Sequence, residues 1–190
     1  MNMSHEELLV PGQRTPLLIQ AGEPHRLSDY ISRSREAIGE KLLRHGALLF
    51  RGFAVADSAD FAEAVQALDI PLLDYRYRST PRTGKGRGVY TATEYPADRE
   101  IPLHNENAYQ RQWPRKLAFC CITPAAVGGA TPIADMREVR RRLDPAIFEK
   151  FARLGVRYDR VFHNMIDLSW QDAFQTDDPD EVARYCASQG

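Results

Sequence analysis

A predicted helix runs directly into a predicted strand near the start of the chain, and this junction constrains the fold most. The helix covers Ser28–His45, begins with Ser28 as its N-cap, and carries its apolar residues near one face. Gly46 stands where a helix-ending glycine belongs, and the short apolar run Ala47–Phe50 follows at once as a buried strand. Helices and strands that follow each other in this way predict an α+β fold.

Capping and periodicity patterns predict the remaining elements. Helices are expected after Asp135, Asp144 and Asp178, and another with Asp57 or Ser58 as its cap; strands are expected over Val89–Thr93, Lys116–Thr123 and Val156–Phe162. The helix after Asp144 has an apolar stripe that we expect to be buried, made of Ile147, Phe148, Phe151 and Leu154. Helices dominate the first third and strands with inserted helices follow, so a sheet or barrel is begun and is expected to lack its last strands.

Length and composition exclude several classes of protein. The 190 residues suffice for one hydrophobic core, so a single domain is expected over residues 1–190. A formal net charge of −1 gives no overall attraction to nucleic acid or to an anionic membrane. No apolar run is long enough to span a bilayer, the N-terminus lacks the pattern of a signal peptide, and three cysteines cannot form a disulfide framework. A cytoplasmic protein is the simplest interpretation.

The chemistry concentrates in the segment Leu103–Asn107. His104 and Glu106 are two residues apart, and on an extended segment this spacing places both side chains on one face. A histidine and a carboxylate so placed are two thirds of the 2-His-1-carboxylate site that holds Fe(II) and leaves positions open for substrate and oxygen. The bare pattern is also common among surface pairs, so the flanking sequence has to decide between the two interpretations.

Three blocks of sequence carry a resemblance to a known family. They are His45–Phe53, then Thr93–Pro96 followed by Ile101–Glu106, then Pro124 through Gly128-Gly129-Ala130-Thr131 to Asp135. In their order and spacing they resemble the taurine dioxygenase and clavaminate synthase-like (TauD/TfdA) Fe(II)/2-oxoglutarate-dependent dioxygenases, particularly the SyrP-like branch. The resemblance covers about residues 44–162.

The resemblance implies a double-stranded β-helix, or jelly roll, with N-terminal and inserted helices. It implies that His104 and Glu106 bind Fe(II), that Thr131 helps to hold 2-oxoglutarate, and that Asp135 is structural. Such enzymes convert 2-oxoglutarate to succinate and CO2 and oxidise an unactivated C–H bond with O2. Because Glu106 supplies the carboxylate that halogenating relatives lack, the resemblance implies hydroxylation or a related oxidation.

The third iron ligand and the arginine that pairs with 2-oxoglutarate are harder to place. His163 is the only histidine after Glu106, and no arginine follows it before Arg184, in the last predicted helix. Two interpretations stay open. Either His163 is the third ligand, or the chain is the N-terminal portion of a longer enzyme whose remaining ligands lie elsewhere.

Substrate and partner contacts are predicted from proximity in sequence. Glu94 and Asn107 are candidates on the substrate side of the metal motif. The basic stretch Arg76–Arg87 either contacts an acidic partner, such as a carrier protein that bears a tethered amino acid, or is a solvated loop.

The leading hypothesis is an Fe(II)/2-oxoglutarate oxygenase of secondary metabolism that acts on an amino acid or an amino-acid-derived metabolite, free or carrier-bound. One alternative is a truncated remnant or binding module that keeps the fold without turnover. A metal-dependent hydrolase or cupin-like isomerase is a further alternative that rests on the same two residues. The sequence leaves the substrate and the oligomeric state open.

Overall fold

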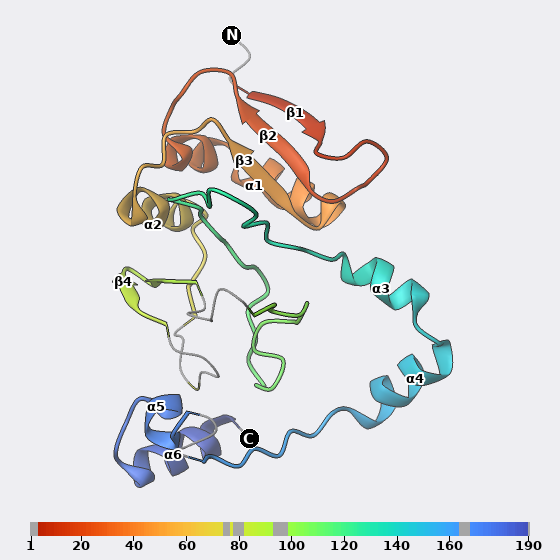
Figure 1. Ribbon diagram of the computed structural model, residues 1–190, viewed down its shortest axis with the longest axis vertical. Coiled ribbons are helices and arrows are strands. Elements are labelled where there is room, and N and C mark those ends of the chain that lie inside the picture. Colours follow the sequence, from red (N-terminus) through yellow and green to blue (C-terminus); the bar gives the residue numbers. More distant parts are fainter. Residues whose placement is uncertain (1–3, 74–76, 78–81, 93–98, 164–167, 190) are drawn as a thin grey trace. The chain divides into compact units, whose positions relative to one another are not determined.

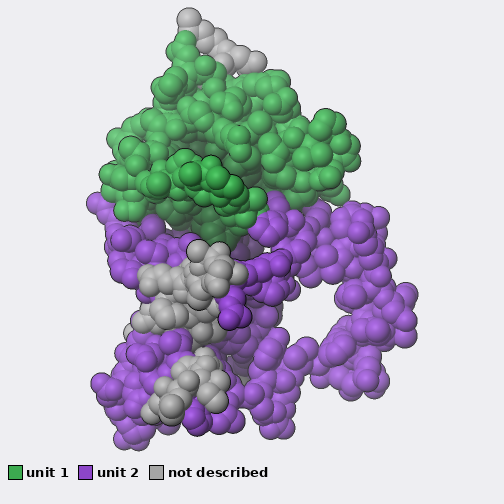
Figure 2. Space-filling view, in the orientation of Figure 1, with its two compact units in different colours: residues 1–71, 118–131 green, residues 72–117, 132–190 purple. Residues whose placement is uncertain are grey.

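The computed structural model describes residues 4–73, 77, 82–92, 99–163 and 168–189. Contacts divide the chain into two compact units (Figure 2). Unit 1 contains residues 1–71 and 118–131, and unit 2 contains residues 72–117 and 132–190. Both helices and strands are present, so the predicted α+β class is confirmed.

Unit 1 is built around a three-stranded sheet (Figure 1). Its strands are β1 (Ser4–Leu8), β2 (Leu17–Ala21) and β3 (Leu48–Arg51), in that order across the sheet. β1 pairs antiparallel with β2, and β2 pairs parallel with β3 so that Leu17 lies opposite Leu48. A parallel pair needs a long crossover connection, and helix α1 (Leu27–His45) provides it.

The core of unit 1 lies between this sheet and its helices. α2 (Ser58–Gln66) packs against α1, and the buried cluster combines strand and helix residues. Its members are Leu17, Ile19, Tyr30, Ile31, Ile38 and Ala64. Ile19, at the centre of β2, is fully buried. Burial of apolar surface on this scale is the main force that holds the sheet and helices together.

Local signals place the helix ends of unit 1, with one exception. Gly46 ends α1 in the left-handed region at φ 78°, and its N–H donates to the carbonyl of Leu42, as predicted. Asp57 caps α2 by accepting from the N–H groups of Ala59 and Asp60. The predicted cap Ser28 is wrong, because α1 begins one residue earlier. The residue at the N-cap position is Arg26, whose backbone forms an isolated β-bridge with Ala54.

The described part of unit 2 contains a short hairpin and four helices. The hairpin is formed by β4 (Gly84–Gly86) and β5 (Val89–Tyr90), and β5 lies within the predicted strand Val89–Thr93. The helices are α3 (Met136–Arg142), α4 (Pro145–Leu154), α5 (Trp170–Phe174) and α6 (Pro179–Gln189). Asp135 and Asp144 cap α3 and α4 as predicted, and Gly155 ends α4.

Three predictions about buried elements are wrong. The stretches Lys116–Thr123 and Val156–Phe162 form no strand, and neither is paired with another segment among the residues that the structure describes. The side chains on α4 are not buried either, since Ile147 is 51% and Phe151 54% exposed. A strand needs a hydrogen-bonded neighbour, and an apolar stripe needs a surface to cover it; neither requirement is visible in the local sequence.

Candidate metal site

His104 presents one defined nitrogen to its surroundings. Its Nδ1 lies 2.8 Å from the carbonyl oxygen of Pro102. Because a carbonyl oxygen can only accept, this contact assigns the proton to Nδ1 and, in the neutral ring, leaves the lone pair on Nε2. A backbone carbonyl that fixes the tautomer in this way is the usual support of a histidine that ligates a metal.

Glu106 directs one carboxylate oxygen toward that nitrogen. Oε2 of Glu106 lies 3.8 Å from Nε2 of His104, so the convergence expected from the two-residue spacing is present. The backbone differs from the expectation, because His104 lies outside any strand and Glu106 begins a turn. The His104 side chain is 59% exposed, whereas that of Glu106 is only 15% exposed.

The second oxygen of Glu106 is held by an arginine. The Arg82 guanidinium lies 3.1 Å from Oε1 of Glu106, and the Arg82 side chain is only 17% exposed. Sequence reasoning missed Arg82 as a site residue. Its signal was the crowding of arginines between positions 76 and 87, but such a pattern does not show which arginine reaches the carboxylate.

The chemistry of this pair fits a divalent metal ion. A lone pair on Nε2 and a carboxylate oxygen repel each other unless a proton or a cation lies between them. Metal bonds of about 2.1 Å place two adjacent ligand atoms roughly 3 Å apart, so the observed 3.8 Å requires only a small side-chain movement. In the described part of the chain, no group of three or more His, Cys, Asp or Glu side chains is placed to hold a metal, so the pair remains two ligands.

The turn after Glu106 is anchored within unit 2. Asn107 takes a left-handed backbone conformation at φ 54°, and its carbonyl accepts from the N–H of Gln110 at 2.9 Å. The side chains of Tyr109 and Gln110 both donate to the carbonyl of Tyr77, at 3.3 and 2.8 Å. The Oδ1 atom of Asn107 is buried and accepts no hydrogen bond from the described residues. It could therefore accept one from a bound molecule.

The other predicted site residues lie in unit 2, in unit 1 or outside the described residues. His163 is exposed in unit 2 and does not join His104 and Glu106 in a three-ligand group among the described residues. Thr131 is exposed and belongs to unit 1, whereas the His104–Glu106 pair belongs to unit 2. Glu94 lies outside the described residues.

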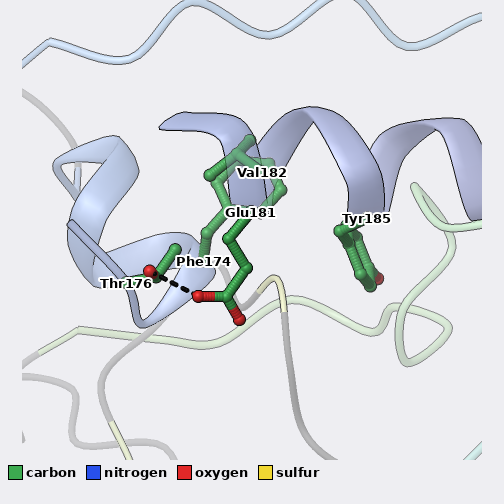
Figure 3. Close-up of a pocket in the computed structure, with 5 residues that line it drawn as sticks. All are labelled: Phe174, Thr176, Glu181, Val182 and Tyr185. Atoms are coloured by element: carbon green, nitrogen blue, oxygen red, sulfur yellow. Dashed lines mark hydrogen bonds between the residues drawn. The ribbon is translucent and has the colours of Figure 1, made fainter. Parts of the chain in front are cut away.

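An aromatic cluster includes Tyr77, the residue that anchors this turn. The ring of Tyr77 stacks on Phe174 with centroids 4.7 Å apart, and Phe162 and Tyr185 contact Phe174 at 5.9 Å each. A small hollow lies beside this cluster, and Figure 3 shows the hydrogen bond from Thr176 to Glu181 at its wall. The hollow has a volume of about 10 Å³, roughly the space for one water molecule, so it is not a substrate pocket.

The adjacent cysteines Cys120 and Cys121 of unit 1 are exposed and join no group of three or more potential metal ligands among the described residues. Burial, together with the neighbouring Cys121, raises the pKa of the Cys120 thiol. The sequence pattern predicted that the pair packs within a strand, and this prediction is wrong, because both cysteines are exposed and Lys116–Thr123 forms no strand.

Comparison with known proteins identifies the family. The family model described as "Taurine catabolism dioxygenase TauD, TfdA family" matches residues 13–185. This chain belongs to that family. TauD/TfdA proteins have a jelly-roll fold and generally use Fe(II) and 2-oxoglutarate. Family membership therefore supports the dioxygenase class that the motifs predicted.

Two curated relatives show which TauD/TfdA proteins the chain is similar to. It is 45% identical over 153 residues to the dapdiamide synthesis protein DdaC of Enterobacter agglomerans. The aligned segment covers 80% of this chain and 46% of DdaC. This chain is 33% identical over 178 residues to a clavaminate synthase-like protein of Arabidopsis thaliana, which covers 89% of this chain and 51% of that protein. The chain thus spans about half the length of these relatives. Among the described residues, no helix has the length and apolar character needed to cross a membrane.

Proposed function

We propose that the whole protein is an Fe(II)/2-oxoglutarate-dependent oxygenase that oxidises a C–H bond of an amino acid or an amino-acid-derived metabolite. The observation that carries this proposal is the His104–Glu106 pair. One nitrogen with an assigned lone pair faces one carboxylate oxygen at 3.8 Å, in a chain of the TauD/TfdA family. The two residues are proposed as two of the three protein ligands of the iron.

The chain's own residues would prepare the site in three ways. The Pro102 carbonyl selects the neutral tautomer whose proton is on Nδ1 and whose lone pair is on Nε2 of His104, and the turn anchored to Tyr77 holds Glu106 opposite it. The buried Oδ1 of Asn107 supports the proposal that Asn107 contacts the substrate. Bound Fe(II) and 2-oxoglutarate would supply the oxidising chemistry, with O2 as co-substrate and succinate and CO2 as products.

Three further residues enter the proposal with less support from contacts. Thr131 is proposed to hold 2-oxoglutarate through its exposed hydroxyl, which follows the left-handed glycines Gly128 and Gly129. Glu94 is proposed beside the substrate because it precedes the metal motif. Because the chain spans about half the length of the two curated relatives, the third ligand is proposed to lie outside this sequence, with His163 as the alternative.

The substrate class rests on the relatives. DdaC is named for the synthesis of dapdiamide, which supports a substrate derived from an amino acid. A carrier-bound substrate is also proposed, because Lys85 and Arg87 are exposed in the β4–β5 hairpin and would attract an acidic carrier protein.

The test measures succinate formed from 2-oxoglutarate by the full-length protein, with Fe(II), O2 and a panel of free and carrier-bound amino acids. We expect turnover that His104→Ala abolishes. The matched control is His5→Ala, since the His5 side chain is 68% exposed in unit 1, where it pairs with the exposed Glu7. A folded wild-type protein that forms no succinate would instead favour the non-catalytic binding module.

A further inference from the structure

Arg82 stands at the base of the β4–β5 hairpin. The next residue, Thr83, donates its N–H to the Thr91 hydroxyl at 2.9 Å, and its carbonyl accepts from the N–H of Thr91 at 2.9 Å. Val89, on the second strand, is buried. The hairpin is therefore closed at the point where Arg82 leaves it, so the backbone that carries the guanidinium is fixed.

The contact between Arg82 and Glu106 differs from an ordinary surface ion pair. Both side chains are more than four-fifths buried, and the nitrogen–oxygen distance is 3.1 Å. Most other ion pairs described here are more exposed, such as Arg157 with Asp159 at 85% and 72%. A charge-assisted hydrogen bond that is shielded from water restrains its partners more strongly than one in solvent.

This contact gives the two carboxylate oxygens of Glu106 different partners. Oε1 of Glu106 accepts from Arg82, while Oε2 lies toward Nε2 of His104. A carboxylate held by one oxygen cannot rotate freely, and only its second oxygen is available to a cation. Hydrogen bonds of this kind to metal-binding carboxylates orient the ligand before the metal arrives.

We infer that Arg82 is a positioning residue that fixes Glu106 with Oε2 facing His104, so that the two residues bind a divalent cation as a preorganised pair. This inference rests on the proposed function, because it takes His104 and Glu106 as metal ligands. A competing effect has the opposite sign: the guanidinium also repels a cation bound nearby. The two effects are separated by whether removal of Arg82 weakens or strengthens metal binding.

The experiment titrates Co(II), as a substitute for Fe(II), into the full-length protein by calorimetry and records its visible absorption. Arg82→Met keeps an unbranched apolar stem and removes every donor, and we expect Co(II) affinity to fall about 10- to 100-fold with an altered Co(II) spectrum. Arg82→Lys keeps the charge without the planar guanidinium, so an intermediate loss is expected. The matched control is Arg142→Met, an exposed arginine of α3 that should leave both measurements unchanged.

The outcomes are distinct. An Arg82→Met variant that binds Co(II) as tightly as the wild type, or more tightly, would overturn the positioning role and leave the proposed function standing. If Arg82→Met does not fold, Arg82→Lys decides, and wild-type affinity in that variant would also overturn the inference. A folded wild-type protein that binds no Co(II) would overturn both the inference and the proposed metal site.

Discussion

Residues 4–71 of unit 1 bury a common core, whereas the described residues of unit 2 bury almost none. Apart from Val89 and Ala173, every buried apolar residue that the structure describes lies in unit 1. Both units have well-capped helices, and α4 has as clear an apolar stripe as any. The difference is that α1 and α2 pack on a sheet in the same unit, while the stripe of α4 is exposed.

Capping residues and an apolar stripe are therefore enough to form a helix but not to bury it. Asp144 and Gly155 suffice to begin and end α4, yet Leu154 remains 62% exposed. The His104–Glu106 pair lies in unit 2, where hydrogen bonds and ion pairs, with one aromatic cluster, provide most of the described support. We therefore expect core mutations in unit 1 to act on stability, and site mutations in unit 2 to act on binding.

The largest effect is expected at the centre of the unit 1 sheet. Ile19→Ala removes a fully buried side chain, so the free energy of unfolding should fall by about 2–5 kcal/mol. Chemical denaturation followed by circular dichroism measures this change. The matched control is Ile147→Ala on α4, where a half-exposed side chain should cost roughly 0.5 kcal/mol or less. Equal losses in the two variants would mean that the stripe of α4 is covered in solution.

A smaller loss is expected in the aromatic cluster of unit 2. Phe174→Ala removes the ring that stacks on Tyr77 and contacts Phe162 and Tyr185. Because Phe174 is only partly buried, the cost should be about 1–3 kcal/mol, below that of a fully buried ring. The hydrogen-exchange rate of the Gln110 backbone N–H should rise in the same variant, because the Gln110 side chain donates to the carbonyl of Tyr77. An unchanged exchange rate would mean that the turn after Glu106 does not depend on the aromatic cluster.

Acid should loosen the start of α6 selectively. The N–H of Asp180 donates to the Asp178 carboxylate and, with the N–H of Glu181 and the Arg184 guanidinium, holds the pKa of Asp178 below its ordinary value. The stabilisation is present above the unfolded-state pKa and is lost as the pH falls through the lower, folded-state pKa. An NMR titration of the Asp180 amide should therefore show a midpoint below 3.8. A midpoint at or above that value would contradict the cap, and Asp178→Ala should remove the transition.

The smallest effect is expected at His163. Its side chain is exposed and does not join the His104–Glu106 pair among the described residues. His163→Ala should therefore change Co(II) affinity of the full-length protein by less than about twofold, well short of the tenfold or larger change typical of residues that support a metal site. A loss as severe as that of His104→Ala would instead identify His163 as the third ligand.

Sequence patterns predicted the features that depend on neighbours along the chain. The end of α1 at Gly46, the cap Asp57 and the convergence of His104 with Glu106 all arise within a few residues. β1 escaped prediction because Ser4–Leu8 is a polar edge strand, one of whose charges, Glu6, pairs with Lys41 at 2.6 Å. The jelly roll implied by the family remains a prediction for the whole protein, since the described strands form a three-stranded and a two-stranded sheet.

Arg82 shows why part of the site stays hidden from sequence reasoning. It lies 24 positions before Glu106, and several arginines nearby satisfy the same pattern. Which of them reaches the carboxylate depends on where the Thr83–Thr91 contacts close the hairpin. That register is a property of paired backbones and is fixed only when the chain folds.

The hydrogen bond from His104 to the Pro102 carbonyl affects how such a site can change in evolution. Its acceptor is a main-chain oxygen, which every amino acid possesses, so no substitution at position 102 deletes it. The proton is thus directed to one ring nitrogen by the path of the backbone. A mutation can lose this preference only by bending that path, and comparison of side chains alone would not detect the loss.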